Sequence, residues 1–424
     1  MRLDLEQKLV CIIGLGYVGL PLARAFSKSL RVIGFDTDPD KVNQFRQQGS
    51  SNQSNLHFTA DPGEISQADF IIICVPTPVT KSKEPDLGYI RGAAEITGQN
   101  LKRGAIVILE STVYPGVTEE VVMPILERES GLKCGADFRV GYSPERINPG
   151  DDEHALDKIT KVVAGMDDDT TSIIAELYSK VTSHIFKARD VKTAEAAKVI
   201  ENVQRDLNIA LMNELAIIFN RMGLSTRDVL DAAATKWNFQ RYSPGLVGGH
   251  CIPVDPYYLV YRARELDYHP QVILAGRAIN DYMPRYIAEI TMKALNEVGK
   301  VIKGSRVLIM GLAYKENVAD IRESPVRRMI KELKEYGIEI TGFDPLLNGA
   351  ELEGEFGIRL LKDWEEVKKI KADGIILAVA HSPFCKLKLS DLKKMQNSSP
   401  VLIDVRQVFD AEEAKRAGFY YKTL

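Results

Sequence analysis

Three glycines in a fixed pattern, GLGYVG at residues 14–19, follow an unbroken apolar segment and precede a stretch of helical character. The first glycine permits a tight turn, the second lets a phosphate group approach the backbone, and the third allows helix and strand to pack closely. The amides at the start of such a helix bind pyrophosphate. The pattern therefore predicts that the chain begins with a dinucleotide-binding α/β domain.

Short apolar segments alternate with helical stretches through the first half of the chain. Each is an unbroken run rather than an alternation of apolar and polar residues, which is typical of strands buried on both faces of a parallel sheet. A doubly wound parallel sheet is therefore expected. The predicted strands are residues 9–13, 31–36, 70–75, 105–110, 138–142 and 160–164.

The second half begins with residues 192–222, which contain no proline or glycine and have helical apolar spacing. Another helical region covers residues 270–298, and strand–helix alternation then restarts at Arg306. Here Gly311 follows a strand without the complete glycine pattern, so this part should not hold a dinucleotide in the same way. Its predicted strands are 307–310, 339–344, 374–380 and 401–405, with a helix at 325–336.

The predicted fold is α/β, with two Rossmann-like doubly wound parallel-sheet domains joined by a long helix and a central helical region. The expected domains are a nucleotide-binding domain at 1–190, a central helical and dimerisation domain at 191–300, and a second Rossmann-like domain at 301–424. A chain of 424 residues is long enough for two or three such domains.

Composition excludes several classes of function. The net charge is −3, so nucleic acid and membrane surfaces are not expected partners. Five scattered cysteines and six histidines suggest neither a disulfide framework nor a metal site. The apolar residues 9–26 contain glycine and proline and lack a basic flank, so they do not resemble a signal peptide. We expect a soluble protein of the reducing cytoplasm.

Asp36 ends the second predicted strand, about 20 residues after the glycine motif. A carboxylate at this place hydrogen-bonds the adenine ribose and repels a 2′-phosphate. NAD is therefore favoured over NADP, although a glycine turn without a ligand would look similar in sequence.

A loop rich in glycine and proline, residues 243–256, surrounds Cys251. An isolated cysteine is usually a small buried residue, which fits Cys11 and Cys74 in predicted core strands. The rigid loop and the nearby Asp255 instead favour Cys251 as a nucleophile, which requires a neighbouring cation to ionise the thiol.

The long predicted helix offers that cation. Lys198 and Asn202 lie four residues apart on one face, and Arg205 continues it. A solvated polar stripe is the alternative. Thr112 and Glu145 follow predicted strands, where open α/β sheets place their ligands, but ordinary turns would look the same.

Together these segments resemble the UDP-sugar 6-dehydrogenase family, which includes UDP-glucose and UDP-N-acetylhexosamine dehydrogenases. The resemblance covers nearly the whole chain. The residues at 199–216 and 236–239 resemble the acetamido-sugar branch, particularly the Vi-polysaccharide-type UDP-N-acetylglucosamine dehydrogenases. The motifs that carry it are GLGYVGLPLA, VPTP (75–78), ESTVYPG, YSPERINPGD, GGHCIPVDPYYL and GLAYKENVADIRESP.

The resemblance implies a four-electron oxidation of the sugar C6 hydroxyl, using two NAD per turnover and no metal. Cys251 would form a thiohemiacetal and then a thioester. Lys198 and Asn202 would stabilise the oxyanion, Asp255 would orient or activate water, and Glu145 and Thr112 would assist hydrolysis and cofactor placement. The implied cofactor contacts are Gly14, Gly16, Tyr17, Val18, Gly19, Asp36, Pro76, Thr77, Thr112 and Arg322.

The second Rossmann-like domain would hold the uridine diphosphate. The implied substrate contacts are Glu145, Arg146, Ile147, Lys198, Asn202, Arg205, Arg241, Tyr242, Gly248, Lys315 and Arg406. UDP-N-acetylglucosamine is the expected substrate, with UDP-N-acetylgalactosamine next and UDP-N-acetylmannosamine or UDP-glucose as alternatives. The product would feed surface polysaccharide synthesis, and a homodimer is expected.

Two readings outside this mechanism stay open from the sequence. A two-electron hydroxyacid dehydrogenase would share the nucleotide domain, a helical middle and a catalytic lysine, but would leave Cys251 and the last domain unexplained. A non-catalytic regulator that binds NAD or a nucleotide sugar would not need the thiol, the lysine and the carboxylates together.

Overall fold

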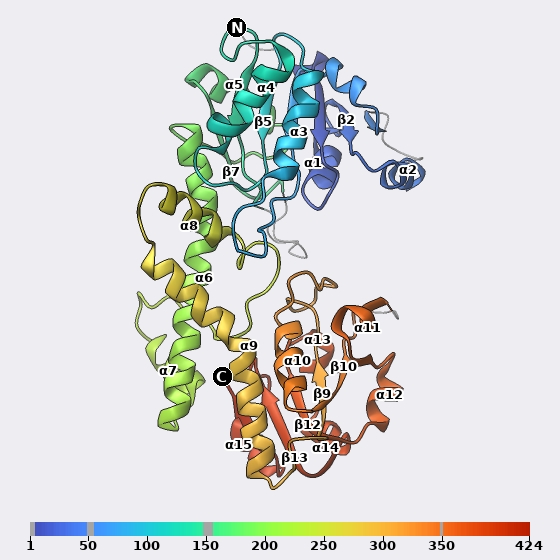
Figure 1. Ribbon diagram of the computed structural model, residues 1–424, viewed down its shortest axis with the longest axis vertical. Helices are drawn as coiled ribbons and strands as arrows, with labels where there is room; N and C mark the ends of the chain where they lie inside the picture. The colour runs from blue at the N-terminus through green and yellow to red at the C-terminus, as the bar shows by residue number, and fades with distance from the viewer. Residues whose placement is uncertain (1–4, 49–54, 147–155, 348–350) are drawn as a thin grey trace. The chain divides into compact units, whose positions relative to one another are not determined.

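The computed structural model describes residues 5–48, 55–146, 156–347 and 351–424. The chain forms two compact units (Figure 1). The first contains residues 1–202 and 254–269, and the second contains residues 203–253 and 270–424. The 32-residue helix α6 (Val191–Met222) contributes its first part to one unit and its remainder to the other.

The first unit is built on an eight-stranded sheet with the order β3-β2-β1-β4-β5-β6-β7-β8. The order reverses at β1 and β4, as in a doubly wound fold. Neighbouring strands are parallel except for β6 and β7, which are antiparallel. The strands are β1 (Leu9–Ile13), β2 (Arg31–Phe35), β3 (Leu56–Thr59), β4 (Phe70–Ile73), β5 (Ile106–Leu109), β6 (Arg139–Tyr142), β7 (Lys161–Gly165) and β8 (Ile185–Lys187).

Helices cover both faces of this sheet, so its central strands are fully buried. The cores on the two faces are separate: α1 and α5 pack in one, and α3 and α4 in the other. The α-helices here are α1 (Gly19–Phe26), α2 (Pro39–Gln48), α3 (Gly88–Gln99), α4 (Met123–Ser130), α5 (Asp168–Tyr178) and α8 (Asp255–Glu265), and the short π-helix η3 (Thr118–Val122) runs into α4.

The second unit contains a six-stranded parallel sheet with the order β11-β10-β9-β12-β13-β14, which repeats the winding of the first. Helices α9 and α10 pack against one face, and α12 to α15 against the other. The strands are β9 (Arg306–Met310), β10 (Glu339–Phe343), β11 (Arg359–Leu360), β12 (Ala372–Leu377), β13 (Gln396–Asp404) and β14 (Tyr420–Thr423). The helices are α7 (Thr226–Ala233), α9 (Gln271–Glu297), α10 (Val326–Glu335), α11 (Glu351–Phe356), α12 (Trp364–Lys369), α13 (Ser382–Cys385), α14 (Leu389–Lys394) and α15 (Ala411–Arg416).

The predicted α/β class, the two doubly wound sheets and the long helix are confirmed. Two details differ from the sequence prediction. The first sheet is not wholly parallel, because β7 runs back beside β6. Ile200, one of the apolar residues within the predicted helix at 192–222, is 53% exposed. Among the helices of the described ranges, none has the length and apolarity needed to cross a bilayer.

Candidate active site

The glycine motif forms the turn that the sequence predicts. Gly14 has φ +90°, and its amide donates to the carbonyl of Phe35 at 2.9 Å. A Cβ atom on Gly19 would lie 1.9 Å from the Gly14 carbonyl oxygen, so only glycine allows α1 to approach the strand this closely. A Cβ atom on Gly16 would meet nothing within 4 Å. The turn therefore leaves open space at the glycine expected to face a pyrophosphate, which fits a dinucleotide.

Asp36 lies directly after β2 and is held by its surroundings. Its carboxylate accepts from the amide of Leu15 at 2.8 Å and from Nζ of Lys41 at 2.6 Å. Burial raises the pKa of Asp36, but the bonds from Lys41, Leu15 and Asp38 outweigh it and the pKa lies below its usual value. Lys41, in the first turn of α2, was not identified from the sequence, where it is one of many exposed helical lysines.

The second sheet repeats this turn but uses it differently. Gly311 has φ +92°, and its amide donates to the carbonyl of Phe343 at 2.9 Å. Asp344, the counterpart of Asp36, accepts from the amide of Leu312 at 2.7 Å and lies 3.0 Å from Nε2 of His381. The next long helix, α10, begins only at Val326. This carboxylate is therefore committed to protein partners, as the incomplete glycine pattern suggests.

The predicted Lys198, Asn202 and Asp255 come together in the first unit. Nδ2 of Asn202 on α6 donates to Oδ2 of Asp255, the first residue of α8, at 2.5 Å, and both side chains are buried. Burial raises the pKa of Asp255 to about 6, while Lys198 and Asn202 oppose the rise and Glu201 adds to it. This part of the first unit therefore combines a cation, an amide donor and a carboxyl group that can gain or lose a proton near pH 6.

Arg146 ties the segment of Glu145 to the same part of α6. Its guanidinium bonds Glu201 at 2.8 Å and the carbonyl of Thr160 at 2.8 Å, while its amide donates to Oε1 of Glu145. Glu145 is buried and Thr112 is half-buried in the loop after β5. Ile147, expected at the substrate, lies outside the described residues.

Cys251 is exposed in a loop of the second unit whose glycines permit close packing. A Cβ atom on Gly248 would lie 2.5 Å from the ring of Pro325, and one on Gly249 would lie 2.7 Å from the ring of Tyr314. The ring of His250 meets that of Tyr314 edge-on at 6.3 Å. The Cys251 loop is therefore seated on the segment that carries Lys315 and Arg322.

Three of the remaining predicted cations pair with carboxylates of the second unit. Arg406 pairs with Glu316 at 2.8 Å, and Glu316 directly follows Lys315 in the chain. The guanidinium of Arg322 donates to both carboxylate oxygens of Asp320, and Arg241 forms an ion pair with Asp231. Arg205 is exposed, and the Tyr242 hydroxyl meets the amide of Gln204 at 3.2 Å. Arg406 is thus tied to the segment that carries Lys315, and Arg241 is held by Asp231.

Three domain models of one family match the chain in order. They are the UDP-glucose/GDP-mannose dehydrogenase family's NAD binding domain at residues 8–182, its central domain at 192–282 and its UDP binding domain at 308–411. This chain belongs to the UDP-glucose/GDP-mannose dehydrogenase family. The family resemblance and the NAD-binding character predicted from the sequence are confirmed, while the domain limits and individual site roles stay predictions.

Relatives and solved structures agree with this assignment of the dehydrogenase. It is 46% identical to a UDP-N-acetyl-D-glucosamine 6-dehydrogenase of Pseudomonas aeruginosa, over 96% of this chain and 98% of that protein. It is 45% identical to a protein of the same name from Salmonella typhi, over 97% and 98%. The structure of a UDP-D-ManNAc dehydrogenase from Pyrococcus horikoshii matches with a TM-score of 0.88 and 28% identity, covering 98% of each chain.

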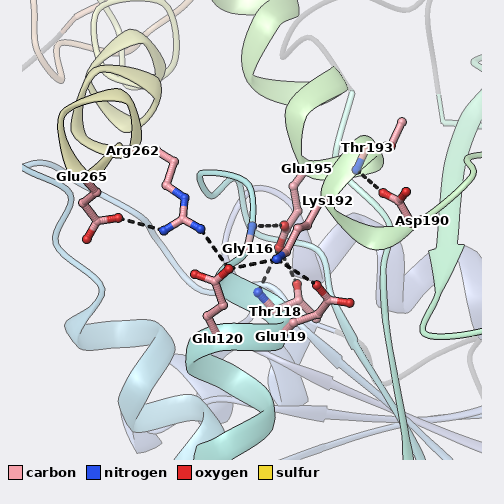
Figure 2. Close-up of polar contacts among 10 residues, drawn as sticks. All are labelled: Gly116, Thr118, Glu119, Glu120, Asp190, Lys192, Thr193, Glu195, Arg262 and Glu265. Atoms are coloured by element: carbon pink, nitrogen blue, oxygen red, sulfur yellow. Dashed lines mark hydrogen bonds and ion pairs between the residues drawn. The ribbon is translucent and has the colours of Figure 1, made fainter. Parts of the chain in front are cut away.

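A buried carboxylate anchors the long helix α6 of the dehydrogenase to the loop after β5 (Figure 2). Glu195 accepts from the amide of Gly116 at 2.5 Å and from the amide and hydroxyl of Thr118 at 2.9 and 2.7 Å. Burial raises the pKa of Glu195 to about 7, although the hydrogen bonds from Gly116 and Thr118 act to lower it. Glu195 lies one turn before Lys198, so the bonds fix that turn against the Thr112 loop. The sequence alone gives no sign of this role, because Glu195 is one of several charged residues of a predicted helix.

An exposed ion network surrounds this anchor. One oxygen of Glu120 receives both Lys192 of α6 and Arg262 of α8, each at 2.9 Å, and Arg262 also bonds Glu265 at 3.0 Å (Figure 2). A single exposed ion pair contributes at most about 1 kcal/mol to stability. The buried hydrogen bonds of Glu195 therefore contribute more to holding α6 against the loop than these pairs do. The network connects the helices of Lys198 and Asp255 through one carboxylate.

Glu195→Ala is expected to lower the free energy of unfolding by about 2–4 kcal/mol at pH 5, because buried amides of Gly116 and Thr118 lose their acceptor. The folded pKa lies above the unfolded one, so the contribution of Glu195 is present at low pH and declines as the pH rises through about 7. Urea unfolding at pH 5 and pH 8 measures both effects. Glu119→Ala, which removes only a 3.6 Å surface pair with Lys192, is the control and should cost under about 1 kcal/mol. An equal loss in both variants would contradict the anchoring role.

Proposed function

We propose that this dehydrogenase oxidises the C6 hydroxyl of a UDP-N-acetylhexosamine to the uronic acid in a four-electron reaction that consumes two NAD. The observation that carries the chemistry is the group of Lys198, Asn202 and Asp255, in which Asn202 and Asp255 are buried and Asp255 lies four residues along the chain from the exposed thiol of Cys251. UDP-N-acetylglucosamine is the leading substrate, because identity is 45–46% to two UDP-N-acetyl-D-glucosamine 6-dehydrogenases but 28% to the UDP-D-ManNAc dehydrogenase structure.

Lys198 and Asn202 have the charge and the donor needed to stabilise the oxygen of the reacting C6. A preorganised donor at a developing oxyanion contributes roughly 3 kcal/mol or more in a site shielded from water. The glycine turn and Asp36 would hold NAD, which would supply the hydride acceptor for each oxidation. Between the two oxidations Cys251 attacks the aldehyde carbon and holds it as a thiohemiacetal, which prevents loss of the aldehyde to solvent.

Hydrolysis of the resulting thioester requires a water held near a carboxylate. Asp255 orients or activates that water, with a pKa of about 6 that leaves it ionised at neutral pH yet able to take a proton. Glu145 and Thr112 assist hydrolysis and placement of the cofactor. Arg322 is assigned to the cofactor side, and Lys315 and Arg406 to the diphosphate. Arg146, Ile147, Arg205, Arg241, Tyr242 and Gly248 are proposed as the other substrate contacts.

Association as a homodimer is supported by apolar side chains left exposed on α6. Leu211, Ile218 and Met222 are 49%, 43% and 64% exposed and lie at helical spacing, so they share one side of the helix. A second copy of the chain is the partner that we propose for this side. The proposed setting is the cytoplasm, with the uronic acid consumed in surface polysaccharide synthesis.

The first test is the amount of NADH formed per UDP-N-acetylglucosamine consumed, run to completion with excess NAD. We expect two NADH per sugar, because oxidation of the alcohol to the aldehyde and of the thiohemiacetal to the thioester each release one hydride. A ratio of one would identify a simple alcohol dehydrogenase and remove Cys251 from the chemistry. Parallel reactions with the galacto and manno epimers and with UDP-glucose identify the sugar, and no NADH from any of them would refute the proposed function.

A further inference from the structure

A lysine with no exposed surface lies beneath the Glu145 segment. Lys161, the first residue of β7, forms an ion pair with Glu110 at the end of β5, and neither side chain is exposed. Its Nζ also donates to the carbonyl of Pro144 at 2.8 Å and lies 3.9 Å from Oε2 of Glu145. The lysine therefore contacts the segment of Glu145 at two points.

The ion pair is enclosed by further contacts that fix its position. Glu110 accepts a hydrogen bond from the hydroxyl of Tyr178, which is fully buried, and Nζ of Lys161 lies 5.1 Å from the centre of the Tyr178 ring. Ser143, next to Pro144, donates to the carbonyl of Val162 at 2.9 Å. The group thus joins the end of β5, the end of β6, the start of β7 and α5.

Charge in this group is shared among two carboxyl groups and one ammonium. Burial raises the pKa of Glu110 to about 7, with Lys161 opposing the rise and Glu145 adding to it. The two carboxyl groups are therefore near enough to act on one another, and Lys161 lies between them. A fully buried ion pair is weak evidence for stability, because desolvation of both ions offsets their attraction. Its position between Glu110 and Glu145 indicates another reason for its presence.

We propose that Lys161 is a positioning residue, which together with Glu110 holds the Glu145 carboxylate in place for hydrolysis of the Cys251 thioester. This rests on the proposed function. In that step a water oxygen bonds to the acyl carbon and the carbon–sulfur bond breaks. The electron pair leaves with the Cys251 sulfur as thiolate, and the protons of water pass to nearby bases as the carboxylate forms. Lys161 touches neither the sugar nor the cofactor.

The test compares Lys161→Met with the double variant Lys161→Met, Glu110→Gln. The single variant leaves a buried carboxylate unpaired and is expected to melt at least about 5 °C lower than wild type. The double variant removes both charges, keeps an acceptor for Tyr178 and is expected to melt within about 3 °C of wild type. If the pair only stabilises the fold, activity should recover with stability in the double variant.

With UDP-N-acetylglucosamine and excess NAD, the double variant is expected to show a burst of two NADH per active site and then turnover at least tenfold slower than wild type. Intact-protein mass spectrometry should find a covalent acyl adduct on the chain, lost when Cys251 is changed to serine. Ile72→Ala, a buried truncation in β4, is the stability control: it should lower the melting temperature without forming the adduct.

Wild-type turnover in the double variant, without adduct, would overturn the positioning role while leaving the proposed function intact. A double variant that melts as low as Lys161→Met would also contradict it, because the pair would then be needed for the fold itself. Absence of NADH from the wild type with every UDP sugar would overturn the proposed function and this inference with it.

Discussion

Cys251→Ser is expected to retain binding of NAD and UDP-N-acetylglucosamine but to lose turnover by at least about 10³-fold. The serine hydroxyl is far less ionised than a thiol at neutral pH, so it cannot capture the aldehyde efficiently. Cys251 is exposed in a loop whose glycines are packed against Tyr314 and Pro325, which places the thiol on rigid support. Steady-state NADH formation and calorimetric binding of both ligands measure the two parts of this prediction.

Cys385→Ser is the matched control. Cys385 is the other exposed cysteine of the chain, and it ends the short helix α13 in the second sheet unit. Its replacement should leave turnover within about twofold of wild type. A Cys251→Ser rate near wild type would exclude the thioester route, and loss of NAD binding would instead indicate that the variant is misfolded.

Much of the fold was predictable because apolar runs and glycine turns are local signals. Strands β1, β4 and β5 and helix α6 lie within a few residues of their predicted limits. Strand β3 (Leu56–Thr59) was missed because its exposed His57 and short length give no unbroken apolar run. The antiparallel direction of β7 was also not predictable, since strand direction depends on the path of the chain and not on the apolar content of the strand.

The candidate site likewise contains residues that sequence motifs predict and residues that they do not. The motifs predict that Asn202 and Asp255 belong to one site, and the two side chains do meet, because Asn202 lies within the long helix α6 and Asp255 begins α8. Glu195 and Lys161 were not selected. Charged residues are usually exposed, yet both side chains are fully buried. Glu195 bonds Gly116, 79 residues away, and Lys161 pairs with Glu110, 51 residues away. Partners so distant in the chain leave no periodic signal.

The pH dependence of the reaction follows from the same cluster. Activity should fall as the pH drops through about 6, where Asp255 becomes protonated and no longer serves as a base. Burial raises the pKa of Asp255 and the Lys198 charge lowers it, so removing that charge should raise it further. The acid limb of the pH–rate profile should therefore move to higher pH in Lys198→Ala.

Lys198→Ala is also expected to lower kcat by at least about a hundredfold, because the developing oxyanion at C6 loses its cation while Asn202 alone remains as donor. KM for the sugar nucleotide should change little, since the interaction is made mainly in the transition state. Lys293→Ala, an exposed lysine on α9, is the charge-matched control and should keep wild-type kinetics. Partial rescue of Lys198→Ala by added ethylamine would show that the missing element is a cation. A defect confined to KM, with kcat and the pH profile unchanged, would assign Lys198 to ground-state binding and leave oxyanion stabilisation to Asn202.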